Sequence, residues 1–396
     1  MRSRIDVERA RAETPGVAHR VHLNNCGAGL MPAPVLEATV EHLRLEAEIG
    51  GYEAAEREAE RVEHCYDAIA RLLNCRPDEV AIVENATIGW DLAFYAMTFR
   101  PGDRILTAVA EYASNYIAYL QVARKTGAEI VVVPDDESGQ LDVAALENLI
   151  DERARLISVT HVPTGGGLVN PAAAIGRVAR AAGVPYLLDA CQSVGQMPVD
   201  VEAIGCDMLS VTSRKFLRGP RGIGFLYVRR TMLEELEPPF IDLHAARWVA
   251  RERYELRPDA RRFENWEKYV AGKVGLGVAV DYALGWGLEA IRDRVYALAD
   301  GIRERILCLP DGRVHDRGRE RCAIVSFTFD GVDPQALKAR AREAGININT
   351  STVYSTRIDM EGRGLEIVNR LGVHYYNSEE EIDRLFAFFE AELAQR

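Results

Sequence analysis

The sequence predicts an α/β protein with a large domain followed by a smaller α+β domain. Strand-like apolar runs alternate with helical segments from residue 80 to about residue 228. Runs such as VPYLLDA are continuously apolar, which is typical of parallel strands covered by helices on both faces. The pattern changes after Glu264, and 396 residues exceed what one ordinary core holds. We therefore expect a large domain with a mainly parallel, seven-stranded type of sheet.

The large domain begins with helices and continues with alternating elements. Helical apolar spacing covers residues 34–75, with a break near Gly50–Gly51. The expected strands are VAIVEN, RILTAVAEY, AEIVVVP, ARLISVTHV and VPYLLDA, and the last two are separated by the helical segment AAAIGRVARAAG. Ligands bind at the carboxyl ends of such strands, so we expect the site there.

The pattern of the smaller domain begins with a long helical stretch at 268–308. The strand CAIVSFTFD, a helix at 334–344 and a final helix at 379–394 follow. We expect three parts: an N-terminal segment at 1–20 that packs with the small domain, a large cofactor-binding domain at 21–267, and a linker helix with the small domain at 268–396.

Composition excludes several classes of protein. The formal net charge of −12 argues against non-specific nucleic-acid binding. No apolar run is long enough to span a bilayer, and MRSRIDVERARAET lacks the apolar stretch of a signal peptide. Seven scattered cysteines form no CxxC pair, so we expect neither a disulfide framework nor a metal site. These features predict a cytoplasmic protein without nucleic-acid or membrane partners.

Asp189 and Lys215 carry most of the functional information. Only five of the 48 basic residues are lysine, and Lys215 follows a strand that comes soon after the one ending at Asp189. A lysine forms imines, which a guanidinium does not. A buried amine beside a carboxylate fits pyridoxal 5'-phosphate (PLP), which needs a Schiff-base lysine and an acid for its pyridine nitrogen. Each residue alone has an ordinary alternative, a helix N-cap for Asp189 and a solvated lysine for Lys215.

Neighbouring residues could bind the phosphate of such a cofactor. Thr212 and Arg214 flank the lysine, and a hydroxyl and a guanidinium both bind phosphate oxygens. Asn85-Ala86-Thr87 precedes a helix, whose N-terminus attracts anions. Plain N-capping by Asn85 or Thr87 explains the same residues.

Two further residues remain ambiguous from the pattern. Tyr112 follows a strand and lies either in the core or against the cofactor. His161 has no second histidine at ligand spacing, which favours a core histidine over a metal ligand.

The chain resembles the class-V aminotransferase family, which comprises fold-type I PLP enzymes. The family includes cysteine desulfurases, isopenicillin N epimerase-like proteins and ergothioneine-pathway C–S lyases. The resemblance covers nearly the whole chain, from HLNNCGAGLMP to NRLGVHYYNSEEEID. It rests most strongly on LLDACQS and TSRKFLRGPRGIG, and further on ENATIGWD, AEYASN and SVTHVPTGG.

The resemblance implies a role for each matched residue. Lys215 is the Schiff-base lysine, Asp189 binds the pyridine nitrogen, and Tyr112 stacks on the ring. Arg370 binds the substrate carboxylate. The remaining residues bind the phosphate or the phenolic oxygen of PLP: Ala86, Thr87, Thr212 and Arg214 for the former, Thr164 and Gln192 for the latter.

Two departures from the desulfurase pattern affect the predicted reaction. Desulfurases carry a nucleophilic cysteine in the loop before the final signature, but residues 345–364 contain none. Cys322 begins an apolar strand, where a thiol is usually inert. We therefore expect no persulfide-forming desulfuration. This chain has Trp266-Glu267 where desulfurases have Gly-Thr. In desulfurases that threonine reaches the phosphate in the partner subunit, so the resemblance does not decide whether this chain makes such a contact.

These features predict a C–S β-lyase acting on an amino acid, with Lys215 as the base that removes the Cα proton. An aminotransferase is the nearest alternative. An epimerase would need a second base from Tyr112, Tyr354 or His161. A non-catalytic PLP-fold protein is disfavoured because the lysine and its partners are all present.

The substrate and the pathway are not determined by the sequence. We expect the pocket for the substrate's side chain to include Asn24, Asn25, Tyr52 and the loop at 349–363. Arg357, Asp359 and Arg363 in that loop either recognise the substrate or are solvated. The resemblance also implies a homodimer.

Overall fold

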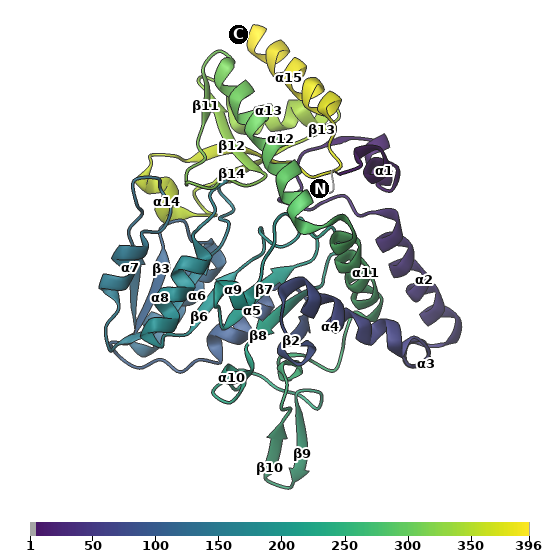
Figure 1. Ribbon diagram of the computed structural model, residues 1–396, viewed down its shortest axis with the longest axis vertical. Coiled ribbons are helices and arrows are strands. Elements are labelled where there is room, and N and C mark those ends of the chain that lie inside the picture. Colours follow the sequence, from purple (N-terminus) through teal and green to yellow (C-terminus); the bar gives the residue numbers. More distant parts are fainter. Residues whose placement is uncertain (1–4, 396) are drawn as a thin grey trace.

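A seven-stranded sheet forms the centre of the computed structural model, which describes residues 5–395 (Figure 1). β8 runs antiparallel to both of its neighbours, whereas the other adjacent strands are parallel. This confirms the predicted α/β class with a mainly parallel sheet. In spatial order the strands are β2 (Val80–Val83), β8 (Gly224–Val228), β7 (Met208–Thr212), β6 (Tyr186–Asp189), β5 (Ala154–Thr160), β3 (Arg104–Ala108) and β4 (Glu129–Val133).

The central strands are apolar throughout because both faces of the sheet are covered. Successive side chains of a strand point to opposite faces. Leu187 and Leu188 of β6 accordingly belong to two different apolar layers, and both are fully buried. The intervening helices are α5 (Ala86–Tyr95), α6 (Ala113–Thr126), α7 (Val143–Leu149), α8 (Ala172–Ala182) and α9 (Val201–Ile204), and α10 (Arg230–Leu233) follows β8, the last of these strands in the chain.

Helices from both ends of the large domain pack together beside the sheet (Figure 1). They are α2 (Ala33–Ile49), α3 (Gly51–Arg57), α4 (Ala59–Leu73) and α11 (Val270–Trp286). The break predicted near Gly50–Gly51 is confirmed, since Gly50 has a φ of 103° between α2 and α3. A φ in this range suits glycine, which lacks a Cβ atom.

The C-terminal part contains a four-stranded antiparallel sheet. Its strands are, in order, β11 (Gly312–Val314), β12 (Ile324–Phe329), β15 (Ile367–Gly372) and β14 (Asn349–Thr352). Its helices are α12 (Leu288–Cys308), α13 (Pro334–Glu343), α14 (Arg357–Gly362) and α15 (Glu379–Ala394). This is the α+β arrangement that the sequence predicts.

The long helical stretch predicted at 268–308 is two helices, α11 and α12, which meet at Gly287 with a bend of 77°. No single helix within residues 5–395 has the length and apolar composition of a membrane span. Only the bent α11–α12 pair meets both criteria together.

The N-terminal segment contacts the C-terminal part of the chain. Arg11, in α1 (Val7–Ala12), donates to the Tyr376 carbonyl at 3.2 Å and pairs with Glu381 at 2.9 Å. β1 (Val21–His22) pairs in parallel with β13 (Ile346–Asn347). The domain boundaries placed at 20 and 267 stay predictions.

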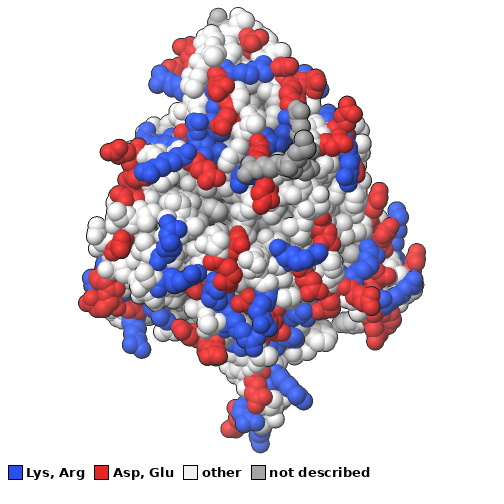
Figure 2. All heavy atoms as spheres, in the orientation of Figure 1, with Lys and Arg blue, Asp and Glu red and all other residues white. Residues whose placement is uncertain are grey.

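A hairpin of β9 (Ala246–Ala250) and β10 (Arg253–Leu256) projects from the large domain (Figure 1). Trp248 is 78% exposed on it. The sequence analysis missed this hairpin. Acidic and basic side chains are interspersed over the face drawn in Figure 2.

Candidate active site

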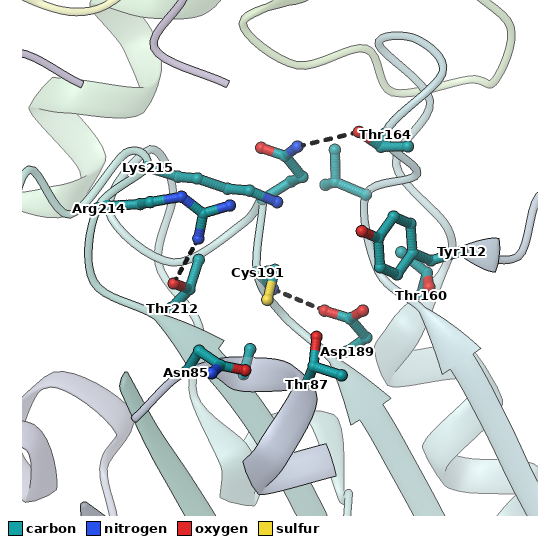
Figure 3. A pocket seen from close by; sticks show the side chains of 13 residues that line it. Asn85, Thr87, Tyr112, Thr160, Thr164, Asp189, Cys191, Thr212, Arg214 and Lys215 are labelled. Carbon is teal, nitrogen blue, oxygen red and sulfur yellow. Dashed lines mark hydrogen bonds between the residues drawn. The ribbon is translucent and has the colours of Figure 1, made fainter. Parts of the chain in front are cut away.

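An open cavity of about 440 Å³ lies at the carboxyl ends of the central parallel strands. All nine residues predicted to bind the cofactor line this cavity, which draws together five separate stretches of sequence (Figure 3). Their individual roles stay predictions. The lining residues are Asn85, Ala86, Thr87, Tyr112, Thr160, Val162, Thr164, Asp189, Cys191, Gln192, Thr212, Arg214 and Lys215.

Lys215 lies on a loop whose conformation is fixed by hydrogen bonds. The loop follows β7, and Ser213 closes it by donating from its hydroxyl to the Ile223 carbonyl at 2.9 Å. The N-terminal segment packs against the loop, with the Gly29 amide donating to the Arg214 carbonyl at 2.8 Å. A Cβ atom on Gly29 would lie 2.6 Å from the Lys215 carbonyl oxygen, so only glycine fits there. The loop therefore fixes the base of the lysine side chain.

The Lys215 amine points into the cavity (Figure 3). It forms no hydrogen bond or ion pair with any residue of the described chain. Burial lowers the pKa of this amine, and the nearby Arg214 and Arg370 lower it further, although Cys191 and Asp189 act in the opposite direction. A lowered amine pKa increases the neutral fraction, which is the form that acts as a nucleophile or base.

Asp189 ends β6 and is 6% exposed. Its Oδ1 accepts from the Cys191 amide at 3.0 Å, and its Oδ2 accepts from the Asn115 side-chain amide at 3.1 Å. No cation pairs with it in the part of the chain that is described. The carboxylate is thus fixed in place without being neutralised.

The N-terminus of α5 and the end of β7 form an anion-binding corner. Asn85 caps α5 by accepting from the Ile88 amide at 3.1 Å, so the capping alternative holds for Asn85. Thr87 in the first turn lines the cavity. Arg214 donates to the Thr212 hydroxyl at 2.8 Å, which places its guanidinium at the same end (Figure 3). A helix N-terminus, hydroxyls and a guanidinium are suited to a phosphate group.

Arg370, on β15, is connected to the cavity through Thr164. Its guanidinium donates to the Thr164 carbonyl at 2.7 Å and to the Thr164 hydroxyl at 2.6 Å. Gln192 donates to the same hydroxyl at 3.5 Å. The Arg370 Nε and the Gln192 Oε1 are buried and have no partner among the described residues. Buried polar atoms usually have partners, so these two indicate a polar ligand.

These residues fit pyridoxal 5'-phosphate. The cavity offers an unpaired lysine, an un-neutralised carboxylate, an anion-binding corner and an orphaned amide oxygen. Lys215 would hold the cofactor covalently, Asp189 would bind its pyridine nitrogen, and Thr87, Thr212 and Arg214 would bind its phosphate. PLP supplies an electron sink for negative charge that develops on the substrate's Cα.

The predicted substrate residues are placed less favourably. Asn25 is fully buried, and its side chain donates to the Gly372 carbonyl and accepts from the Tyr376 hydroxyl, while its role in substrate binding stays a prediction. It joins the N-terminal segment to β15. Asn24 does not line the cavity, and its backbone bridges to Gly372. Tyr52 is 73% exposed on α3 and also lies outside the cavity lining.

The polar residues of the loop at 349–363 pair within the protein. Arg363 pairs with Asp359 at 3.1 Å, and Arg357 pairs with Glu361. Tyr354 is 75% exposed. His161 is buried outside the cavity lining, and burial lowers its pKa to about 4.

The sequence places Glu111–Asn115 and Asp189–Gln192 among the polar clusters at strand ends, but it gave no role to Glu111, Asn115 or Cys191 and did not single out Thr160. Thr160 and Cys191 line the cavity, and Glu111 and Asn115 lie buried behind it. Glu111 and Asn115 are four residues apart at a helix start, which is the spacing at which side chains meet. That spacing was the available signal.

The fold and the cavity define a PLP-dependent enzyme that acts on an amino acid. The chain belongs to the class-V aminotransferase family, because the family model described as "Aminotransferase class-V" matches residues 21–385.

Relatives and solved structures match almost the full length of the chain. A probable cysteine desulfurase from Methanothermobacter thermautotrophicus is 28% identical over 96% of both chains. The apo structure of a cysteine desulfurase from Thermococcus onnurineus matches with a TM-score of 0.91 and 25% identity, and covers all of both chains. The cystine C–S lyase C-DES shares the fold, with a TM-score of 0.85 and 24% identity over 94% of this chain and 98% of C-DES.

The prediction that the protein is not a persulfide-forming desulfurase is therefore wrong. A probable cysteine desulfurase and a cysteine desulfurase structure match this chain along almost its whole length. The exclusion rested on one loop without a cysteine, and a single loop is weaker evidence than similarity across the chain. Cys191 also lies in the cavity wall, with its sulfur between Asp189 and Lys215 (Figure 3), but burial raises the pKa of its thiol.

Proposed function

We propose that the protein cleaves the Cβ–S bond of cysteine or of an amino acid derived from cysteine. The observation that carries the proposal is the unpaired Lys215 amine, with its lowered pKa, facing the cavity that Asp189 lines and to which Arg370 is joined through Thr164. The relative is named a probable cysteine desulfurase, the first structure is named a cysteine desulfurase, and C-DES is named a cystine C–S lyase. Both activities break the same bond.

Arg370 would bind the substrate carboxylate. Its guanidinium is fixed by two hydrogen bonds to Thr164, and its Nε remains without a partner. A fixed guanidinium binds a carboxylate with defined orientation, and so positions the Cα proton. Tyr112 forms part of the cavity wall, where its ring would stack on the cofactor.

Lys215 would be the catalytic base. Its Nζ takes the proton from Cα, because burial has already lowered the pKa of the amine. The resulting ammonium can then donate a proton to the departing sulfur. Asp189 would hold the pyridine nitrogen protonated throughout, since its carboxylate is fixed but not neutralised.

The products distinguish the two forms of the proposal. The PLP-loaded protein is incubated with L-cysteine, L-cystine and a cysteine S-conjugate, and pyruvate, ammonia, alanine, sulfide and persulfide are measured. Pyruvate with ammonia indicates β-elimination, whereas alanine with a persulfide indicates desulfuration. Either result supports C–S cleavage.

The controls are two lysine variants. K215A should abolish product formation, and K125A should not, because Lys125 is exposed on α6. Accumulation of pyridoxamine phosphate with a keto acid, and no sulfur product, would identify an aminotransferase and sink the proposal. Racemisation without sulfur release would identify an epimerase and sink it equally.

A further inference from the structure

Glu111 is a buried carboxyl group that the proposed reaction does not use. It lies between β3 and α6, one residue before Tyr112, the N-cap of α6, and it is 3% exposed. No arginine or lysine pairs with it among residues 5–395. Burying an acid without a cation is unfavourable, so its retention calls for a physical reason.

Five donors surround the Glu111 carboxylate. Oε1 accepts from the Tyr112 amide at 2.8 Å, from the Asn115 side-chain amide at 2.9 Å and from the Thr160 hydroxyl. Oε2 accepts from the Thr160 amide at 3.0 Å and from the Thr107 hydroxyl at 3.1 Å. These bonds hold the Glu111 carboxylate against Tyr112 and Thr160, which line the cavity.

Asn115 joins this carboxylate to Asp189. Its Nδ2 lies 2.9 Å from Glu111 Oε1 and 3.1 Å from Asp189 Oδ2. An amide nitrogen has two hydrogens, enough for one bond to each carboxylate, and the Thr160 hydroxyl lies farther away at 3.5 Å. The amide cannot rotate without losing one of the two bonds, so Glu111 determines where Asn115 holds Asp189.

We propose that Glu111 is a positioning residue that acts through Asn115 to hold the Asp189 carboxylate on the cofactor's pyridine nitrogen and so favours the protonated nitrogen. The inference rests on the proposed function, in which Asp189 binds that nitrogen. The chemistry is electrostatic: a second negative charge behind Asp189 stabilises a cation in front of it.

The ionisation of Glu111 falls in the physiological range. Burial raises its pKa to about 7, and Asp189 adds to this, although hydrogen bonds from Thr160 and Asn115 oppose the rise. The other titratable groups that face it are Tyr119 on α6 and Tyr186 on β6, and burial raises both tyrosine pKa values well above their usual value. Arg357 and Glu111 both line a second cavity, but Arg357 is paired with Glu361.

The test reads the protonation of the pyridine nitrogen against pH, from the nitrogen-15 chemical shift of bound PLP labelled at that atom, in the absence of substrate. E111Q removes the charge and keeps the size of the side chain. We expect the midpoint of the pyridine nitrogen's titration to fall by about one pH unit, because the negative charge that favours its protonation is lost. N115A should shift the midpoint in the same direction, and the E111Q/N115A double variant should shift it no further than the larger single change.

E79Q is the matched control. Glu79 is also buried, at 6% exposed, and accepts from the Arg76 and Arg230 amides, away from the cavity. Its midpoint should equal that of the wild type. A folded E111Q with a wild-type midpoint would overturn the inference. If E111Q does not fold, N115A decides: a wild-type midpoint there overturns the inference as well.

This readout separates the inference from the proposed function. If the midpoint shifts in E111Q and N115A but the wild-type protein releases no sulfur product, the role of Glu111 stands and the proposed C–S cleavage fails. If the wild-type protein releases sulfur but neither variant shifts the midpoint, the C–S cleavage stands and the role of Glu111 fails.

Discussion

Two regions of the protein bury charged side chains. In one region the charges pair with one another, and in the other they do not. Around Glu264 the charges neutralise one another. The Glu264 carboxylate accepts from Lys268 at 2.5 Å, from the Tyr66 hydroxyl at 2.8 Å and from the Ile82 amide at 2.8 Å. Lys273 is buried nearby, with Glu63 at 3.5 Å. In this cluster each of these buried charges lies beside an opposite charge.

In the cavity the charges stay separate. Lys215 has no partner, and Asp189 and Glu111 are held by neutral donors among the residues that the structure describes. The difference appears in the two buried glutamates. Burial disfavours ionisation of both, but His244 and Lys268 lower the pKa of Glu264 to about 2, whereas Glu111 has no cation and its pKa rises to about 7. Buried charges that do not pair with one another indicate a site that a ligand completes.

Replacing the unpaired lysine should have the largest effect. K215A should lose the visible band of lysine-bound PLP and reduce turnover about 10³-fold, because both the covalent anchor and the base are removed. Absorbance and product assays measure this. K273A removes the buried lysine of the other region, and it should lower the melting temperature yet keep the band. Loss of the band in K273A, or its retention in K215A, would break the comparison.

Arg370 should mainly affect substrate binding. R370A should raise KM for the amino acid about a hundredfold, since a buried guanidinium that binds a carboxylate contributes several kcal/mol. Steady-state kinetics measure the change, and the visible band checks that the cofactor stays bound. R363A is the control, because Arg363 already pairs with Asp359 and should leave KM unchanged. Equal KM values for R370A and wild type would contradict the assignment.

Glu264 should affect stability rather than chemistry. Its folded-state pKa of about 2 lies below the ordinary 4.5, so its contribution is complete above about pH 4.5 and is lost as the pH falls towards 2. The contribution is roughly 3 kcal/mol. Denaturant unfolding as a function of pH should show this acid dependence in the wild type and a flatter curve in E264Q. An unchanged slope in E264Q would show that the ion pair is not the cause.

The smallest expected effect is that of Cys191. Burial raises the pKa of its thiol above the reactive range, and nearby Asp189 raises it further. C191A should therefore change turnover by less than about threefold. Kinetics with L-cysteine and L-cystine measure this. A selective loss of persulfide and alanine in C191A would instead identify Cys191 as the sulfur acceptor.

The sequence predicted the parts of the molecule that repeat a simple pattern. The parallel strands were recognisable because both of their faces are buried, and the cofactor residues because they follow strand ends. The hairpin of β9 and β10 was missed because Arg247, Val249 and Arg253 do not produce an apolar alternation. Its strands are mostly exposed, so burial leaves no pattern in them.

The sequence was least informative where contacts join distant segments. Asn25 looked like a free polar residue, but Tyr376, 351 positions away, occupies its side chain. Glu111 and Asp189 meet only through Asn115, 74 positions from Asp189. The order of residues carries no signal for such contacts. Arg370 was assigned by resemblance, and its anchoring by Thr164 could not be foreseen.

The most direct test of the central claim is to locate the cofactor's covalent attachment. The protein is loaded with PLP, reduced with borohydride, digested and mapped by mass spectrometry. The chain has only five lysines, at 125, 215, 268, 273 and 338, so the map is unambiguous. The account predicts a phosphopyridoxyl group on Lys215 alone. Labelling of Lys273 or Lys268 in its place, or no labelling of any lysine, would contradict it.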